Sequence, residues 1–147
     1  MKKGQAAMEF LMTYGWAILV VLAAIGALAY FGVLSPDRFM PSKCMVTGGF
    51  SCTQYKIASN NTVYMEVQNN LGVDATNIVI NLSITSPSAC QTLYNLTSLG
   101  NGVSTGLISY PCGATSGKAK GEITITYTKS GETVMHTTTG SISGNVE

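Results

Sequence analysis

The chain changes its pattern of hydrophobic and polar positions abruptly near residue 35. No charged residue occurs from residue 10 to residue 34, and most positions there are apolar. A helix over these residues is about 37 Å long, enough to cross a hydrocarbon core of about 30 Å. The segment therefore predicts a helix that enters a membrane.

Beyond residue 44 the hydrophobic pattern has a period of two, because apolar residues recur at every second position. The clearest runs are residues 63–68, 78–84 and 123–128, and turn-forming stretches lie at residues 59–61, 69–72 and 129–132. Short strands at this spacing predict an antiparallel β-sandwich, with a length close to that of an immunoglobulin-like domain. The predicted fold class is thus α+β: a long N-terminal hydrophobic helix followed by an antiparallel, immunoglobulin-like β-sandwich.

Charge is sparse and balanced along the chain. Lys and Arg number 8, Asp and Glu number 7, and charged residues make up only 10% of the sequence. A protein that binds nucleic acid needs a basic patch or stripe, so this composition argues against such a partner. The polar surface after residue 35 must come from Ser, Thr and Asn, which is common in extracellular proteins.

The N-terminal apolar segment has three competing interpretations. Lys2 and Lys3 should stay in the cytoplasm, which places the rest of the chain outside. A secretory signal peptide could be cut after Ala27-Leu28-Ala29, leaving Tyr30 first, but its apolar core is usually only about 7–15 residues long. A plain anchor would keep Met1. A helix that is retained after a cut upstream of it is the third possibility.

The residues before the apolar run favour the third possibility. They read Lys2-Lys3-Gly4-Gln5-Ala6-Ala7-Met8-Glu9-Phe10. This stretch resembles the class III signal peptide of archaeal type IV pilins, in which a short basic leader ends in Gly, the mature chain starts with Gln, and a Glu is the fifth mature residue. The corresponding cut lies between Gly4 and Gln5, and Glu9 is fifth after it. The family often has Ser at the third mature position, where this chain has Ala7.

The resemblance implies a structural subunit of an archaeal type IV adhesion pilus. A prepilin peptidase would cut the leader, and a pilus assembly ATPase with a membrane platform would build a helical homopolymer. The resemblance also implies that the new amine of Gln5 pairs with Glu9 of a neighbouring subunit. The chain would lie in the cell membrane before assembly and in a cell-surface filament afterwards. The alternatives are a membrane-anchored or minor pilin-like extracellular binding module, and a secreted β-domain.

These expectations divide the chain into four parts. They are a leader at residues 1–4, a hydrophobic membrane or filament-core helix at 5–34, a linker at 35–43, and an extracellular β-sandwich at 44–147. The linker contains Pro36 and Pro41, and proline cannot continue a helix. Ala23 and Ala27 in the helix have the small-xxx-small spacing that lets neighbouring helices approach closely.

The four cysteines, Cys44, Cys52, Cys90 and Cys112, fit an oxidising location. Four cysteines allow three pairings, and the one between sequence neighbours, Cys44–Cys52 with Cys90–Cys112, is the simplest. A zinc site is the rival interpretation. The spacings contain no C-x-x-C pattern and His136 is the single histidine, so we expect disulfides and no metal.

Three Asn-x-Ser/Thr sequences would be N-glycosylation acceptors in an exported chain, at Asn60, Asn81 and Asn95. Asn81 lies on the strand face opposite Ile80 and Leu82, so we expect its side chain to be exposed to solvent. Archaeal pilins are often glycosylated, which is what the resemblance implies for these sites.

No catalytic constellation is recognisable in the sequence. The chain has one histidine, no G-x-S-x-G, no P-loop and no cluster of metal ligands. His136 is interpreted as an ordinary strand residue. We therefore expect a protein that is not an enzyme and that uses no cofactor.

Overall fold

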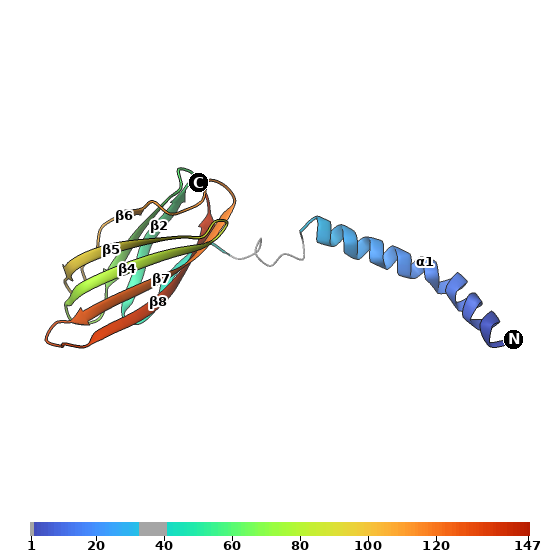
Figure 1. Ribbon diagram of the computed structural model, residues 1–147, viewed down its shortest axis with the longest axis horizontal. Coiled ribbons are helices and arrows are strands. Elements are labelled where there is room, and N and C mark those ends of the chain that lie inside the picture. Colours follow the sequence, from blue (N-terminus) through green and yellow to red (C-terminus); the bar gives the residue numbers. More distant parts are fainter. Residues whose placement is uncertain (1, 33–40) are drawn as a thin grey trace. The chain divides into compact units, whose positions relative to one another are not determined.

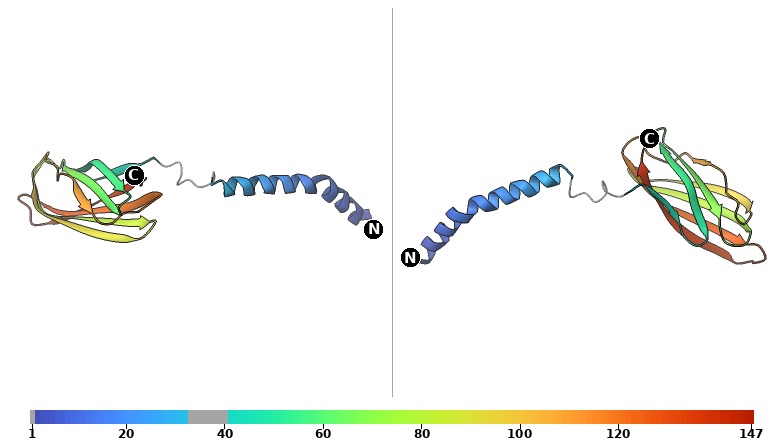
Figure 2. Two further views of the ribbon diagram at one scale, coloured as in Figure 1. Left: turned by 90° about the horizontal axis from the view of Figure 1, so that it is seen from above. Right: turned by 180° about the vertical axis from the view of Figure 1, so that it is seen from behind.

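The computed structural model describes residues 2–32 and 41–147 of the chain (Figures 1 and 2). The chain divides into two compact units, Met1–Met40 and Pro41–Glu147, which are described separately. The predicted linker at 35–43 lies largely outside the described residues.

The first unit contains one helix, α1 (Lys2–Tyr30), which includes the predicted leader residues from Lys2 onward. It ends at Tyr30 rather than at residue 34. The reason is Gly32, whose φ of 68° is left-handed and cannot continue a right-handed helix. The amide of Phe31 still donates to the carbonyl of Ala27 at 2.9 Å, and the amide of Gly32 donates to Ala29 at 3.1 Å.

The second unit is a sandwich of two antiparallel sheets (Figure 1). The five-stranded sheet has the order β1 (Lys43–Val46), β8 (Met135–Asn145), β7 (Lys118–Lys129), β4 (Ala75–Ser86), β5 (Cys90–Leu99). The three-stranded sheet has the order β2 (Phe50–Ala58), β3 (Thr62–Asn69), β6 (Ile108–Tyr110). The predicted α+β class with an antiparallel sandwich is confirmed. The sheets do not follow the ABED and CFG order of immunoglobulin domains, so the immunoglobulin-like detail is not confirmed.

The sandwich core is built from the residues that alternate along the predicted strands. Val63, Met65 and Val67 of β3 are completely buried. On the facing sheet, Leu82 of β4 lies opposite Ile123 of β7, and both are completely buried as well. Burial of one such side chain contributes about 1.5–3 kcal/mol, so these alternating positions fix which face of each strand points inward.

The turn from β3 to β4 is closed by a buried polar residue, Asn69, which has no exposed surface. Its side-chain amide donates to the carbonyls of Val73 at 3.0 Å and Leu99 at 2.9 Å, and its side-chain oxygen accepts from the amide of Leu71 at 3.0 Å. A buried polar group is tolerated when its hydrogen bonds are satisfied in this way. Asn69 thereby joins the predicted turn at 69–72 to the end of β5.

Two disulfides join the sheets at both open sides of the sandwich. Cys44–Cys52 links β1 to β2, which are edge strands of the two sheets on one side. Cys90–Cys112 links β5, the opposite edge of the large sheet, to the segment just after β6. The structure thus contains the pairing between sequence neighbours, and none of the four cysteines is free. Each bridge resists separation of the sheets where no backbone ladder connects them.

We predict that removing the Cys90–Cys112 bridge destabilises the sandwich more than removing the Cys44–Cys52 bridge. Cys90–Cys112 closes a loop of 22 residues and Cys44–Cys52 a loop of 8 residues. In the chain-entropy model, these loops stabilise the folded state by about 3.5 and about 2.5 kcal/mol, respectively. Urea unfolding of the two double Cys→Ala variants, compared with the unchanged chain, measures the difference. Equal losses, or a larger loss for the Cys44/Cys52 variant, would contradict the prediction.

Candidate functional site: the N-terminal helix and the acceptor asparagines

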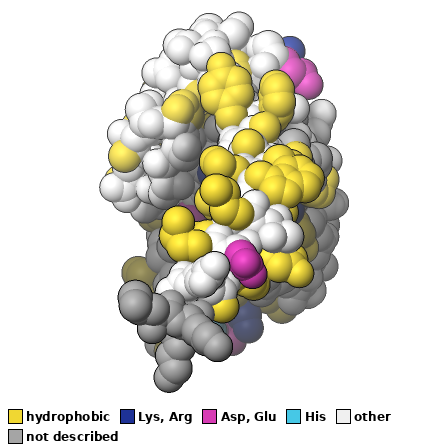
Figure 3. Space-filling view, turned by 90° about the vertical axis from the view of Figure 1, so that its right-hand side faces the viewer, with side chains coloured by type: hydrophobic (Ala, Val, Ile, Leu, Met, Phe, Trp, Pro, Cys, Tyr) yellow, Lys and Arg dark blue, Asp and Glu magenta, His cyan; other side chains and the backbone are white. Residues whose placement is uncertain are grey.

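The most unusual surface of the described chain is that of α1. From Gly4 to Tyr30, every residue is exposed except Gly15 and Ala17, which are half-buried. Large side chains such as Trp16 and Leu19 keep about two thirds of their surface, 67% and 69%. Figure 3 shows hydrophobic side chains, in yellow, gathered on the surface that faces the viewer. Soluble monomers rarely expose so large an apolar surface, so this one indicates a site that a membrane or other helices cover.

The length of the helix matches a membrane. Its uncharged part, from Phe10 to Tyr30, rises about 31 Å, close to the hydrocarbon thickness of about 30 Å. Among the described residues, α1 is the one helix whose length and composition would allow a crossing. A signal sequence near the N-terminus has the same properties. The helix therefore indicates membrane anchoring or export, and the two disulfides indicate an oxidising, extracellular location for the sandwich.

The helix is bent in its N-terminal third, as Figures 1 and 2 show. At the bend the hydroxyl of Thr13 donates to the carbonyl of Glu9 at 2.8 Å. A threonine bound to the carbonyl four residues before it often bends a helix, because it competes with the backbone amide for that oxygen. Gly15 follows within the same turn and adds flexibility, since glycine is a weak helix former.

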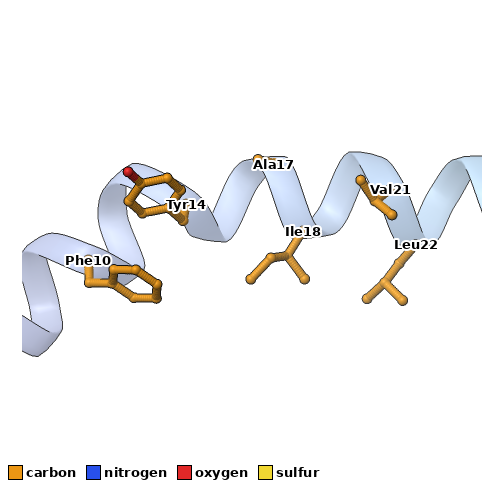
Figure 4. Close-up of a pocket in the computed structure, with 6 residues that line it drawn as sticks. All are labelled: Phe10, Tyr14, Ala17, Ile18, Val21 and Leu22. Carbon is orange, nitrogen blue, oxygen red and sulfur yellow. The ribbon is translucent and has the colours of Figure 1, made fainter.

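A concave apolar stripe lies on one side of the helix and begins at the bend (Figure 4). The hollow has a volume of about 410 Å³ and is lined by Phe10, Tyr14, Ala17, Ile18, Val21 and Leu22. The rings of Phe10 and Tyr14 lie with their centroids 4.8 Å apart at its N-terminal end. The stripe is almost purely apolar, so it offers a packing surface rather than a binding site for a polar ligand. The sequence did not reveal this feature, because an all-apolar segment has no marked face.

The predicted processing and assembly residues lie on consecutive turns of α1. Gly4, Gln5 and Glu9 are all exposed, and Gln5 and Glu9 lie on the same side because they are four residues apart. Glu9 is the one acidic residue of the helix and is not part of the concave stripe. Nothing lies within 4 Å of the position that a side chain at Gly4 would begin to occupy. The roles of these residues remain predictions.

Two of the three acceptor asparagines are accessible. Asn60 is exposed in the turn between β2 and β3, and Asn95 is exposed in the middle of β5. Both could be reached by a glycosylating enzyme without movement of a strand.

The expected exposure of Asn81 was wrong. Its side chain does point away from the core, but it is half-buried, and its side-chain oxygen is buried without a hydrogen-bond partner. The reason is that β4 lies between β5 and β7, so Leu93 and Thr124 stand on either side of Asn81. Alternation along one strand reveals the direction of a side chain but not how its neighbours cover it.

His136 lies in β8, as expected of a strand residue, but it has specific partners. Its Nε2 is 2.6 Å from a carboxylate oxygen of Glu132, and its ring stacks on Tyr127 with centroids 5.4 Å apart. The hydrogen bond with His136 lowers the pKa of the Glu132 carboxyl below its usual value. This arrangement closes the turn between β7 and β8. Within the described part of the chain, no three His, Cys, Asp or Glu side chains are grouped so that they could hold a metal ion.

A scan against protein-family models found no match to the chain, and a search of curated proteins found none either. Function must therefore be argued from the chain's own residues and their placement.

We predict that N-glycans, where the producing cell attaches them, occupy Asn60 and Asn95 to a greater extent than Asn81. The side chain of Asn81 would have to leave its place between two neighbouring strands to be modified. Mass spectrometry of glycopeptides from the native protein measures the occupancy of each site. Occupancy at Asn81 that equals or exceeds that at Asn60 would contradict this expectation.

Proposed function

We propose that this chain is a structural subunit of an archaeal type IV adhesion pilus. One observation carries the proposal: an uncharged, unburied helix that fits a membrane directly follows the sequence from Gly4 to Glu9 that resembles a prepilin cleavage site. In this proposal the helix is first a membrane anchor and later an element of the filament core. The sandwich remains outside.

The helix has two unlike faces, which supports an open-ended assembly. At 3.6 residues per turn, Ala23 and Ala27 lie roughly opposite the concave stripe around Tyr14, Ile18 and Val21. Ala23 and Ala27 of one helix can enter the hollow of another, because small residues allow close approach. Contacts between two different faces are heterologous, and such contacts build filaments when they do not close into a ring.

The sandwich is suited to a position outside the cell. It has its own core, and both its disulfides require an oxidising environment. Its accessible acceptors, Asn60 and Asn95, would carry glycans on the outer surface. The proposed partners follow from this scheme: a prepilin peptidase, a pilus assembly ATPase, a membrane platform and further copies of the chain.

A membrane-anchored or minor pilin-like binding module is the second candidate, and a secreted β-domain is the third. The exposed apolar helix supports the anchor as well as it supports the pilin. The first residue of the mature protein separates three classes: Gln5 supports the pilin class, which includes a minor pilin-like module, Met1 supports a plain anchor, and Tyr30 supports the secreted domain.

We predict that a peptidase cuts between Gly4 and Gln5, and that Gly4→Trp leaves the chain uncut in the membrane. The space around Gly4 is open in the structure, so the bulky Trp side chain should not disturb the helix. It should instead prevent the peptidase from binding and cutting the chain. Gly4→Ala is the matched control and should still be cut. N-terminal sequencing of filaments and membranes measures processing, and filaments that begin with Met1 would refute the proposed cut.

We predict that Glu9→Gln blocks filament assembly but not processing. The cut creates a positively charged amine at Gln5. In a filament, this amine and the Glu9 carboxylate of a neighbouring subunit would form a pair buried among apolar helices. Removing one partner of a buried pair typically costs about 3–5 kcal/mol. A simple favourable interaction with the helix dipole would account for only about 0.3–1 kcal/mol.

Electron microscopy of cell surfaces, with mass spectrometry of the membrane fraction, tests this prediction. Glu9→Asp is the control, because it keeps the charge and should assemble at least in part. Normal numbers of filaments from Glu9→Gln cells would remove Glu9 from the assembly mechanism, and uncut Glu9→Gln chains would show that it acts on processing.

A further inference from the structure

We propose that the free edge of β5 pairs with the β5 edge of a second copy of this chain, forming one sheet that continues across both molecules. This pairing would involve the sandwich alone and would not require a filament.

The edge is open along its whole length. Strand β5 (Cys90–Leu99) pairs with β4 on one side and is the last strand of the five-stranded sheet. Among the described residues, no backbone hydrogen bond joins residues 91–98 to any segment other than β4. In an antiparallel sheet, every second residue of an edge strand directs its amide and carbonyl outward. Half of the backbone groups of β5 are therefore available to another strand.

Side-chain burial indicates that the described residues of the sandwich leave this side uncovered. The residues of β5 that point into the sandwich, such as Thr92 and Tyr94, are only half-buried. Their partners on the neighbouring strand β4, Leu82 and Ile80, are almost completely buried. The difference arises because β4 has a strand on each side and β5 has a strand on only one.

The other edges of the sandwich carry features that prevent strand pairing. β1 is only four residues long and begins with Lys43, and β6 has only three residues. β2 contains Lys56 and has a shift of register between Cys52 and Gln54. Short edges, edge lysines and bulges are the devices by which natural proteins block edge-to-edge contacts.

The large sheet has one more open stretch, where β8 extends past β1, and His136 there is paired with Glu132. β5, in contrast, has ten residues with no charge, no proline and no glycine. It is the long edge of the described sandwich without a protective feature, so it is suited to pairing.

Charge favours a second copy as the partner. No charged residue stands between Asp74 and Lys118, a stretch that includes β4, β5 and β6. Two copies can therefore approach through this side without repulsion between like charges, and a charged partner would find no counter-charge. A two-fold axis through the join would pair the same strand with itself in antiparallel fashion, so both edges would be satisfied equally. Leu93 is 61% exposed on the outer face of β5. A second strand at this edge would remove part of its apolar surface from contact with water.

Asn95 lies in the middle of the same strand and is exposed. A glycan on Asn95 would fill space that the second strand needs. The inferred pairing is thus a property of the chain with an unmodified Asn95, and glycosylation would act as the protection that β5 lacks.

The test measures amide hydrogen exchange in the full-length chain, produced without glycosylation and held in detergent micelles, at low and high protein concentration. Three chains are compared: the unchanged chain, Leu93→Lys and Val134→Lys. Val134 has the same 61% exposure as Leu93 but lies in the turn before β8, so it is a matched control. In the unchanged chain and in Val134→Lys, high concentration should slow exchange of the outward amides of β5 by about tenfold.

Leu93→Lys should lose this protection, because a lysine placed on an edge strand opposes its pairing with another strand. Unchanged protection of β4 amides in that variant shows that its sandwich is folded. Fast exchange of the β5 amides at the highest concentration would overturn the proposal. So would equal protection in Leu93→Lys, and so would an oligomer whose β5 amides stay unprotected, since the helix would then be responsible for association.

Discussion

Water cannot solvate the surface of α1 without a large free-energy cost, and this constraint limits where the whole chain can be stable. Each Å² of apolar surface moved out of water contributes about 25 cal/mol, and nearly all of this helix is exposed in the isolated chain. The helix is therefore stable only where lipid or another apolar surface covers it. A membrane offers no hydrophobic driving force between helices, so shape decides which helices meet there. In the proposed filament, the concave stripe that begins near Thr13 would supply such a shape.

The sandwich is stabilised by a core of its own within the unit Pro41–Glu147. Its two sheets are held face to face by alternating apolar residues, and a sheet pair is weakest at its open sides. The bridges Cys44–Cys52 and Cys90–Cys112 lie at those two sides, and Asn69 closes one end through three hydrogen bonds. Few charges remain on the surface, so solubility depends on hydroxyl and amide groups.

The parts of this structure that were predictable from sequence are those governed by local pattern. The buried faces of β3, β4 and β7 follow directly from period-two alternation, and the disulfides join sequence neighbours. The end of α1 was misjudged because Gly32 stops a helix by its backbone conformation, while hydrophobicity continues to residue 34. Non-local properties were not predictable: the strand order, the cover over Asn81 by Leu93 and Thr124, and the position of β5 at an edge all depend on which strands become neighbours.

The two proposed interfaces differ in symmetry, and this difference has a structural consequence. The helix would join copies through two unlike faces, an arrangement that extends a polymer without limit. The edge of β5 would join copies through one face to itself, an arrangement that ends after two molecules. A self-paired edge cannot be the repeated contact within a polar filament, because a two-fold axis reverses direction. If both interfaces act, the β5 edge connects one filament to another, and modification of Asn95 determines whether filaments remain separate or associate side by side.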